Sequence, residues 1–206
     1  MEIKSLPEEI NERIRSDNKI NSFCQCILEL IFNSLDAKAT SIVIRINTEK
    51  HQVQIIDNGN GISLSDLQNV GVRYMTSKCD SLYVYENKHK YYGYRGEALA
   101  SILSVSQKLI ISTRHIEGEF TYTKTFENGT FESTVPAKVR SSKGTTVIII
   151  GFFFNCPVKQ KRIKNSVDLN SIKITLKALA IIHPTVSFSL RDDNTGKILL
   201  NCFKTE

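Results

Sequence analysis

Three polar clusters interrupt the apolar patterning of the first half of the chain. The first places Glu29, Asn33 and Asp36 close together, the second is an acid on a glycine turn at Asp57-Asn-Gly-Asn-Gly61, and the third is the glycine-rich run Gly93-Tyr-Arg-Gly-Glu97. A carboxamide oxygen suits Mg²⁺ when the other ligands are waters and phosphate oxygens. A carboxylate one turn away can activate a water that faces a phosphate. The three clusters together predict a nucleotide pocket.

The first cluster lies on a predicted helix. Leu28, Ile31 and Leu35 recur at roughly helical spacing, and the three polar residues are spaced i, i+4 and i+7, so they form one stripe. A solvated helix face would explain such a stripe equally simply. However, asparagine is a poor helix former that is usually tolerated for a specific contact. The segment from Ile20 to Ile31 also carries too little charge for a freely exposed helix, which favours the pocket.

The second cluster ends a predicted β-hairpin with strands at Ser41–Ile46 and Gln52–Ile56. A plain turn explains Asn58 to Gly61, because Asn-Gly is a common turn signal. It does not explain an acid placed directly after two isoleucines, where it would be at least partly buried. A buried acid needs a hydrogen-bond donor, and the exocyclic amine of adenine would serve. Alone, this motif is weak support for a nucleotide.

The third cluster follows a capping-box-like helix start at Ser63-Leu-Ser-Asp66 and the tripeptide Thr76-Ser-Lys78. The run from Cys79 to Tyr92 is polar, rich in tyrosine and without periodicity, and loops of that length are usually functional or disordered. We expect nucleotide binding to order it. Gly93 and Gly96 then lead into a predicted helix at 98–105, whose backbone N–H groups suit phosphate. Tight packing is the alternative reading of the glycines.

The remainder of the chain predicts a single domain over residues 1–206. Its fold class is an α/β two-layer sandwich, with a mainly antiparallel mixed sheet and helices on one face. The pattern after Lys108 is mostly strands, at 109–113, 119–124, 129–133, 145–150, 186–190 and 197–201, with a helix at 168–182. Asn128-Gly129 indicates a hairpin turn.

Composition narrows the function only slightly. The net charge of +6 is compatible with nucleic acid without being diagnostic. The basic run Lys159–Lys164 suits DNA phosphates or, equally, a solvated helix start. The five cysteines lack metal-site spacing, which suggests free thiols in a reducing compartment. No stretch is long and apolar enough for a membrane span.

Taken together, the clusters resemble the motifs of the GHKL ATPases, a family that includes gyrase-type topoisomerases, Hsp-type chaperones, histidine kinases and MutL proteins. The heptapeptide Gly93–Leu99 is similar to the MutL signature, with Tyr94 in place of phenylalanine. The same family is matched by Asn33–Ala37, Thr76–Lys78, Gly144–Thr146 and Phe153–Pro157, and the resemblance covers about residues 21–200.

Within the MutL proteins, two departures from the usual pattern occur, at Asn18–Cys26 and Lys159–Lys161. With Gly71–Cys79 and His183–Leu190, they most resemble the third eukaryotic branch, a subunit of the MutL-gamma heterodimer. That branch is associated with meiotic crossing-over and with a minor share of mismatch repair.

The resemblance implies a role for each matching residue. Glu29 would be the general base, Asn33 would hold Mg²⁺, and Asp57 would bind adenine with Thr145 in support. The other cofactor-binding positions that it implies are Asp36, Ala37, Gly59, Gly61, Thr76, Ser77, Lys78, Gly93, Tyr94, Arg95, Gly96, Glu97, Ala98 and Leu99.

The resemblance also implies ATP and Mg²⁺ as cofactors, with hydrolysis driving a conformational switch in mismatch repair and meiotic recombination. Implied partners are DNA, MutS-type mismatch-recognition complexes and another MutL homologue bound through a C-terminal domain, all in the nucleus. Family members continue into a second domain that supplies a lysine to the γ-phosphate. We therefore expect an N-terminal ATPase fragment or a truncated form with weak hydrolysis. The alternatives are a nucleotide-sensing DNA-binding or dimerisation module with negligible hydrolysis, or another MutL paralogue.

Overall fold

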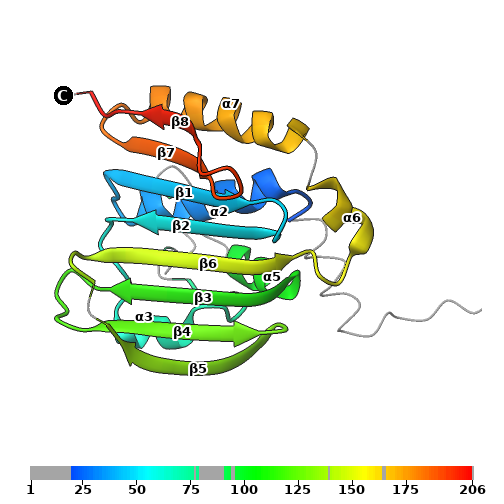
Figure 1. Cartoon of the computed structure of the whole chain (residues 1–206). Helices are drawn as coiled ribbons and strands as arrows, with labels where there is room; N and C mark the ends of the chain where they lie inside the picture. Colours follow the sequence, from blue (N-terminus) through cyan, green and yellow to red (C-terminus); the bar gives the residue numbers. More distant parts are fainter. Residues whose placement is uncertain are drawn as a thin grey trace, which may run out of the picture.

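One mixed sheet of eight strands forms the body of the computed structural model, which describes residues 20–76, 78, 91–93, 96–138, 140–163 and 166–205. The strand order is β5-β4-β3-β6-β2-β1-β7-β8 (Figure 1). β1 pairs with β7 in parallel, and the other neighbouring strands pair antiparallel. The strands are β1 (Ser41–Asn47), β2 (Gln52–Asp57), β3 (Ser106–Arg114), β4 (Thr121–Glu127), β5 (Thr130–Ala137), β6 (Gly144–Phe152), β7 (Ser187–Asp192) and β8 (Ile198–Cys202).

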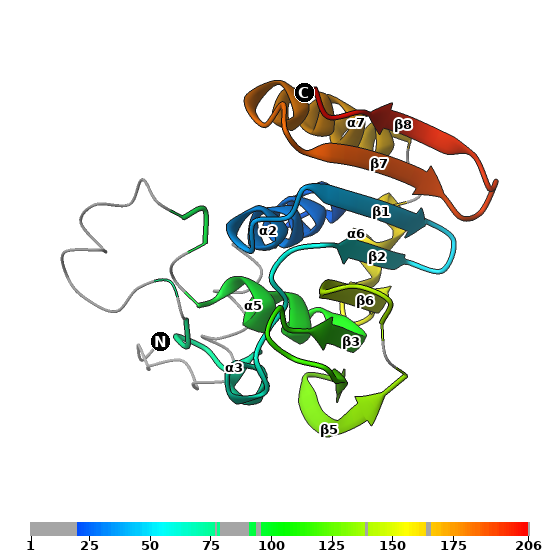
Figure 2. The ribbon, with the colours of Figure 1, turned by 90° about the vertical axis from the view of Figure 1, so that its left-hand side faces the viewer.

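The helices form a second layer on one face of this sheet, as Figures 1 and 2 show. This arrangement confirms the predicted two-layer sandwich. In the described residues, the helices are α2 (Phe23–Asp36), α3 (Leu64–Asn69), α5 (Ala98–Ser104), α6 (Pro157–Arg162) and α7 (Ser166–Ile182).

The core lies between α2 and the central strands. Phe23, Ile27 and Leu30 of α2 are buried at helical spacing. Every second residue of β1 is buried as well, because alternate side chains of a strand point to the same face. Fully burying one such side chain stabilises the fold by about 1.5–3 kcal/mol relative to exposing it. Ser22 caps the helix, since its Oγ accepts from the Gln25 N–H at 3.1 Å. This packing fixes which face of α2 remains for the polar stripe.

The predicted elements are confirmed with small shifts at their ends. α7 begins at Ser166 rather than at residue 168, and β3 begins at Ser106, which pairs with Phe152 of β6. Asn128 and Gly129 both have left-handed φ values, 51° and 81°, as the predicted two-residue hairpin turn between β4 and β5 requires. The short helix α6, with proline in its first turn, contains the first part of the basic run Lys159–Lys164.

The helices that the structure describes include none with the length and apolar character needed to cross a membrane.

Candidate functional site

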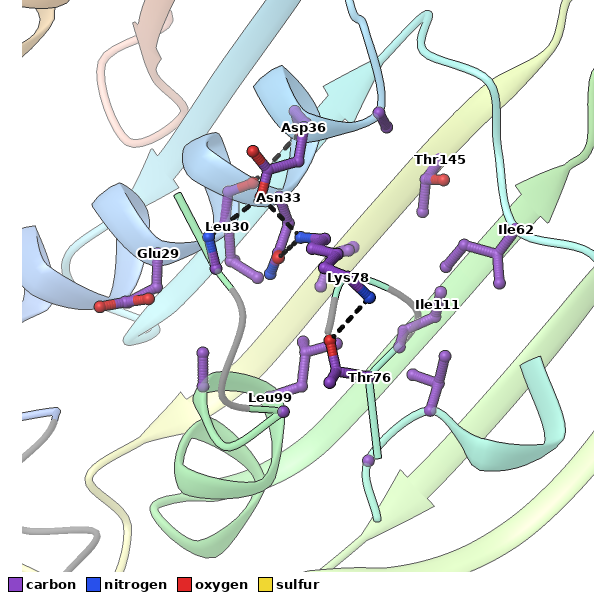
Figure 3. A pocket seen from close by; sticks show the side chains of 18 of the residues that line it. Glu29, Leu30, Asn33, Asp36, Ile62, Thr76, Lys78, Leu99, Ile111 and Thr145 are labelled. Carbon is purple, nitrogen blue, oxygen red and sulfur yellow. Dashed lines mark hydrogen bonds and ion pairs between the residues drawn. The ribbon is translucent and has the colours of Figure 1, made fainter. Parts of the chain in front are cut away.

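A cavity of about 900 Å³ lies between the helix layer and the centre of the sheet. Its walls come from α2, the turn after β2, α3, the segments around residues 71–78, 91–93 and 96–100, and strands β3 and β6 (Figure 3). Segments that are far apart in the sequence therefore meet around one space. The predicted site residues that line it are Glu29, Asn33, Asp36, Ala37, Asp57, Gly61, Thr76, Lys78, Gly93, Gly96, Glu97, Ala98, Leu99 and Thr145.

Four predicted site residues are placed differently or not at all. Gly59 does not line the cavity. It supports Asp57 instead, because its N–H donates to Asp57 Oδ1 at 2.9 Å. Ser77, Tyr94 and Arg95 lie outside the described residues, as does most of the predicted nucleotide-ordered segment from Cys79 to Tyr92.

One end of the cavity is a buried hydrogen-bond network around Asp57. The Asp57 carboxylate is 7% exposed. Oδ1 accepts from the Gly59 N–H and from the Thr145 N–H at 3.0 Å, and Oδ2 accepts from Ser34 Oγ at 3.0 Å. Thr145 Oγ1 lies 3.1 Å from Thr113 Oγ1 on β3. We call Ser34, Asp57, Thr113 and Thr145 the Asp57 end of the cavity.

Burial raises the pKa of the Asp57 carboxyl above its usual value, because removal from water disfavours the charged form. The hydrogen bonds from Gly59, Thr145 and Ser34 lower this pKa and offset part of the effect. Arg140 also lowers it, and its Nη2 donates to the Asp57 backbone carbonyl at 3.1 Å. The carboxylate is thus held in place while Oδ2, which accepts from a single hydroxyl, keeps capacity for a further donor.

The opposite end of the cavity is organised by Asp36 at the last turn of α2. Its side chain is 3% exposed. Oδ2 accepts from Lys78 Nζ at 2.7 Å and from the Gly93 N–H at 3.0 Å, while Oδ1 accepts from the Tyr92 N–H at 3.0 Å. Lys78 Nζ also donates to Asn33 Oδ1 at 2.9 Å (Figure 3). We call Asn33, Asp36, Lys78, Tyr92 and Gly93 the Asp36 end.

The Gly93 N–H, which the sequence suggested would face a phosphate, therefore donates to Asp36 in this structure. Its neighbour Tyr92 also lines the cavity and is anchored by two ring contacts. The Tyr92 ring stacks on Phe32 of α2 with centroids 4.5 Å apart and planes at 5°, and its hydroxyl lies 2.7 Å from His183 Nε2. The chain that enters the glycine run is consequently fixed to α2 by both backbone and side chain.

Gly96 brings the glycine run close to the segment before Lys78. Its φ is +64°, and a Cβ built there would lie 2.5 Å from the Met75 backbone oxygen. Only glycine fits that conformation and spacing. The next residues, Ala98 to Ala100, begin α5 and line the cavity, and the side chain of the N-cap residue Glu97 makes no capping hydrogen bond to the helix.

The cavity offers one oriented ligand for a cation. Asn33 Oδ1 already accepts from the Lys78 ammonium, which acts as a stand-in positive charge beside that oxygen. The described residues contain no group of three or more histidine, cysteine, aspartate or glutamate side chains suited to a metal. A hard cation held by one amide oxygen, phosphate oxygens and waters needs no such group, so the residues present fit Mg²⁺ bound together with a nucleotide.

Glu29 lies one turn before Asn33 on the same face of α2 and lines the cavity. Gln25 Nε2 donates to its Oε1 at 3.4 Å, a long contact that leaves the carboxylate largely available. A carboxylate in that place can accept a proton from a water near the Asp36 end.

Three residues that the sequence analysis did not identify support the site. Ser34 and Thr113 belong to the Asp57 network, and Arg140 holds the Asp57 backbone. Ser34 had a signal, because it follows Leu30 by four residues on the apolar side of α2, where a hydroxyl needs a partner. No feature of the sequence indicated a role for Arg140, because it follows β5 and contacts Asp57 only in the folded chain.

A comparison with protein families matches residues 21–145 to the family described as histidine kinase-, DNA gyrase B- and HSP90-like ATPases. The matched segment contains each of the three polar clusters from which the site was predicted.

Among curated proteins, the chain is 40% identical over 205 residues to the DNA mismatch repair protein Mlh3 of Homo sapiens, covering 99% of this chain and 14% of that protein. It is 35% identical over 192 residues to the MLH3 protein of Arabidopsis thaliana, covering 92% and 16%. It is also 35% identical over 195 residues to MutL of Prosthecochloris aestuarii, covering 93% and 30%. The chain thus spans less than a third of the length of these relatives.

Among solved structures, the Aquifex aeolicus MutL ATPase domain complexed with ADP matches with a TM-score of 0.71 and 28% identity, over 90% of this chain and 65% of that one. The N-terminal domain of a DNA repair protein matches with a TM-score of 0.76 and 26% identity, over 98% and 59%. These matches confirm the predicted fold class.

Proposed function

We propose, since this chain belongs to the GHKL ATPase family and is a MutL-type ATPase domain, that it binds ATP with Mg²⁺ and hydrolyses it as a conformational switch. The observation that carries the proposal is the single cavity that brings Glu29, Asn33 and Asp57 together with the glycine run. A relative with 28% identity binds ADP in an ATPase domain of this fold.

In this proposal the Asp57 end receives the base. Asp57 Oδ2 accepts a hydrogen bond from the exocyclic amine of adenine, and the carboxylate is held ready by Ser34, Gly59 and Thr145. The neighbouring apolar residues Ile62 and Ile111 line the same cavity and cover the ring faces. A pre-positioned acceptor costs little ordering when the ligand arrives.

The Asp36 end receives the phosphates. Asn33 Oδ1 holds Mg²⁺, which neutralises phosphate charge when bound. Lys78 then exchanges Asn33 for a phosphate oxygen, because two cations cannot share the same oxygen without repulsion. The N–H groups at the start of α5 add donors directed at negative charge. Other predicted binding residues that line the cavity are Ala37, Gly61, Thr76, Gly93, Gly96, Glu97, Ala98 and Leu99.

Glu29 is the proposed general base. It lies one turn from Asn33, so its carboxylate can take a proton from a water aligned with the terminal phosphate. A module that only binds nucleotide needs no such carboxylate, which favours hydrolysis over the alternative of a nucleotide-sensing DNA-binding or dimerisation module.

We also propose a role for this protein in mismatch repair and, by the MLH3-type likeness, in meiotic recombination. DNA, MutS-type complexes and a second MutL homologue are the proposed partners, and the nucleus is the proposed location. The likeness to the human and plant MLH3 proteins supports this assignment. We also propose that residues 1–206 form one ATPase domain, and that Lys159 to Lys164 contact DNA phosphates.

Two substitutions on α2 test the ATPase proposal together. Asn33→Ala should remove the Mg²⁺-dependent part of ATP affinity in calorimetry while leaving a native circular dichroism spectrum. Glu29→Ala should keep ATP binding and lower phosphate release by about 10²- to 10⁴-fold, the usual contribution of a general base. Phosphate release is measured side by side in the unaltered chain and in both variants, at the same concentrations of ATP and Mg²⁺.

The two outcomes that contradict the proposal are distinct. Unchanged Mg²⁺-dependent affinity in Asn33→Ala would remove the metal assignment. Unchanged hydrolysis in Glu29→Ala would show that another residue is the base. ATP binding without measurable phosphate release in the unaltered chain would favour the sensing module.

A further inference from the structure

A buried lysine on β4 holds the wall of the cavity without facing the cavity itself. Lys124 is 3% exposed. Its Nζ donates to three backbone carbonyls, those of Leu67 at 2.9 Å, Gln68 at 2.7 Å and Val70 at 3.0 Å. An ammonium group has three N–H donors, so each of them has a partner in α3 or directly after it.

These carbonyls lie in the C-terminal turn of α3 and directly after it, and the Leu67 oxygen also accepts from the Val70 N–H at 3.3 Å. The last carbonyls of a helix lack intrahelical donors, and a lysine near that end satisfies them and interacts favourably with the helix dipole. The ammonium also lies 5.0 Å from the ring centroid of Phe126 and 5.3 Å from that of Phe131, a cation–π arrangement. One side chain on β4 therefore fixes the end of a six-residue helix that is too short to be stable alone.

The fixed segment is part of the cavity wall. Its lining residues are Asp66, Asn69, Val70, Gly71 and Val72. The turn at Gly71 packs against the same strand as Lys124, since a Cβ built on Gly71 would lie 2.8 Å from Phe126 Cζ. Lys124 also pairs in register with Ile111 of β3, which lines the cavity.

The other end of α3 is tied to the Asp57 network. The Ile62 N–H donates to Thr113 Oγ1 at 2.9 Å, and Thr113 contacts Thr145, whose N–H donates to Asp57. Ser63 caps the helix through the Asp66 N–H at 3.1 Å. The wall is consequently held at its start by the base-binding network and at its end by Lys124.

We propose that Lys124 is a positioning residue for nucleotide binding, which sets the distance between the α3 wall and the Asp57 end of the cavity. This inference rests on the proposed nucleotide function. Because the wall starts from the Asp57 network and not from Asn33 or Lys78, losing Lys124 should weaken every adenine nucleotide alike, whatever its number of phosphates.

Lys124→Met tests this directly, since it keeps an unbranched side chain that is one atom shorter and removes all three donors. We expect ATP and ADP affinities to fall by the same factor, about 5- to 20-fold, with an unchanged Mg²⁺ dependence of the ATP value. The ATP and ADP affinities of Lys124→Gln, which retains amide donors, should lie between those of Lys124→Met and those of the unaltered chain. Lys177→Met is the matched control, because Lys177 is an exposed lysine of α7 that does not line the cavity.

The competing explanation is that Lys124 only stabilises the fold. In that case Lys124→Met would lower the melting temperature but leave both affinities equal to those of the unaltered chain, which would overturn the proposal. A loss of ATP affinity alone, with ADP unchanged, would also overturn it. If Lys124→Met does not fold, the ATP and ADP affinities of the folded Lys124→Gln chain test the proposal by the same criteria. Failure of the unaltered chain to bind any nucleotide would instead count against the proposed function.

Discussion

The two ends of the cavity are built from different kinds of structure. At the Asp57 end, the polar contacts join regular elements, with Ser34 from α2, Asp57 from β2, Thr113 from β3 and Thr145 from β6. At the Asp36 end, α2 is joined to segments that lie between elements, through Lys78, Tyr92 and Gly93. The first end is fixed by the sheet, and the second depends on how loops are held.

In the proposed function, the Asp57 end binds the base of the nucleotide and the Asp36 end binds its phosphates, and the two ends suit these roles differently. In that function, Asp57 would bind the base with little reorganisation, because the donors that hold its carboxylate are already in place. At the Asp36 end, Lys78 and Gly93 already have protein partners, so binding phosphate there requires an exchange of partners. Binding energy is then partly used for ordering, and the exchange couples nucleotide binding to loop position. We therefore propose that base recognition belongs to the Asp57 end of the cavity and switching to the Asp36 end.

The largest effect is expected from Asp57→Asn, which keeps the shape of the side chain and replaces an acceptor oxygen by an amide donor. ATP affinity should fall by about 10- to 100-fold, as expected for a lost hydrogen bond to a charged group worth about 1.5–3 kcal/mol. Adenosine, measured by competition against a fluorescent ATP analogue, should lose the same factor.

GTP provides the second measurement on the same variant. Guanine carries a carbonyl where adenine carries the amine, so an amide at position 57 should narrow the preference for ATP over GTP. If adenosine affinity were unchanged in Asp57→Asn, the base would not bind at this end.

A smaller effect is expected from Asp36→Asn, which weakens the contacts that hold Lys78, Tyr92 and Gly93. ATP affinity should fall by about tenfold, or about 1.4 kcal/mol, because hydrogen bonds and an ion pair to a shielded carboxylate are lost. Adenosine affinity should not change, since the Asp57 end is untouched. Asp193→Asn is the control, as Asp193 pairs with Arg45 and Arg191 and does not line the cavity. Equal losses for ATP and adenosine would contradict the division into two ends.

The smallest effect concerns pH and Ser34. The ionised Asp57 carboxylate is a stronger acceptor for the adenine amine than the protonated carboxyl group. Because burial raises the pKa of Asp57, nucleotide affinity should fall as pH decreases, beginning above the usual carboxyl pKa near 3.9. The Ser34 hydroxyl stabilises the ionised form and lowers this pKa. Ser34→Ala should therefore shift the loss of affinity to higher pH, with little change at neutral pH. Calorimetric titrations across pH 4–8 measure the midpoint, and identical profiles would show that Ser34 does not tune Asp57.

Much of the fold was predictable from local pattern. The alternation in Ser41–Ile46 and Gln52–Ile56, the cap at Ser63 and the Asn128-Gly129 turn each depend on neighbours in the sequence, and the structure contains each of them. Element ends were less predictable. β3 extends to Ser106 because it pairs with β6, a contact between residues that are far apart in the chain.

The residues of the site were predictable for a related reason. Asn33, Asp57 and the glycine run have residue types that local structure alone does not require, and their order resembles a known set of motifs. The sequence by itself therefore determined the family of the chain, and it predicted which side chains would carry the chemistry.

The tertiary structure decided what those side chains contact. The partners of Asp36 lie 42 to 57 residues away in the chain, and Asp57 meets Thr145 across 88 residues. In the sequence, nothing distinguishes Lys124 from an ordinary lysine of a strand. Its ammonium group is buried, and has three carbonyl acceptors, because α3 packs against β4 in the folded chain. Propensity and spacing act over a few residues, whereas burial and the satisfaction of buried polar groups are set by the whole fold, so these supporting residues became visible only there.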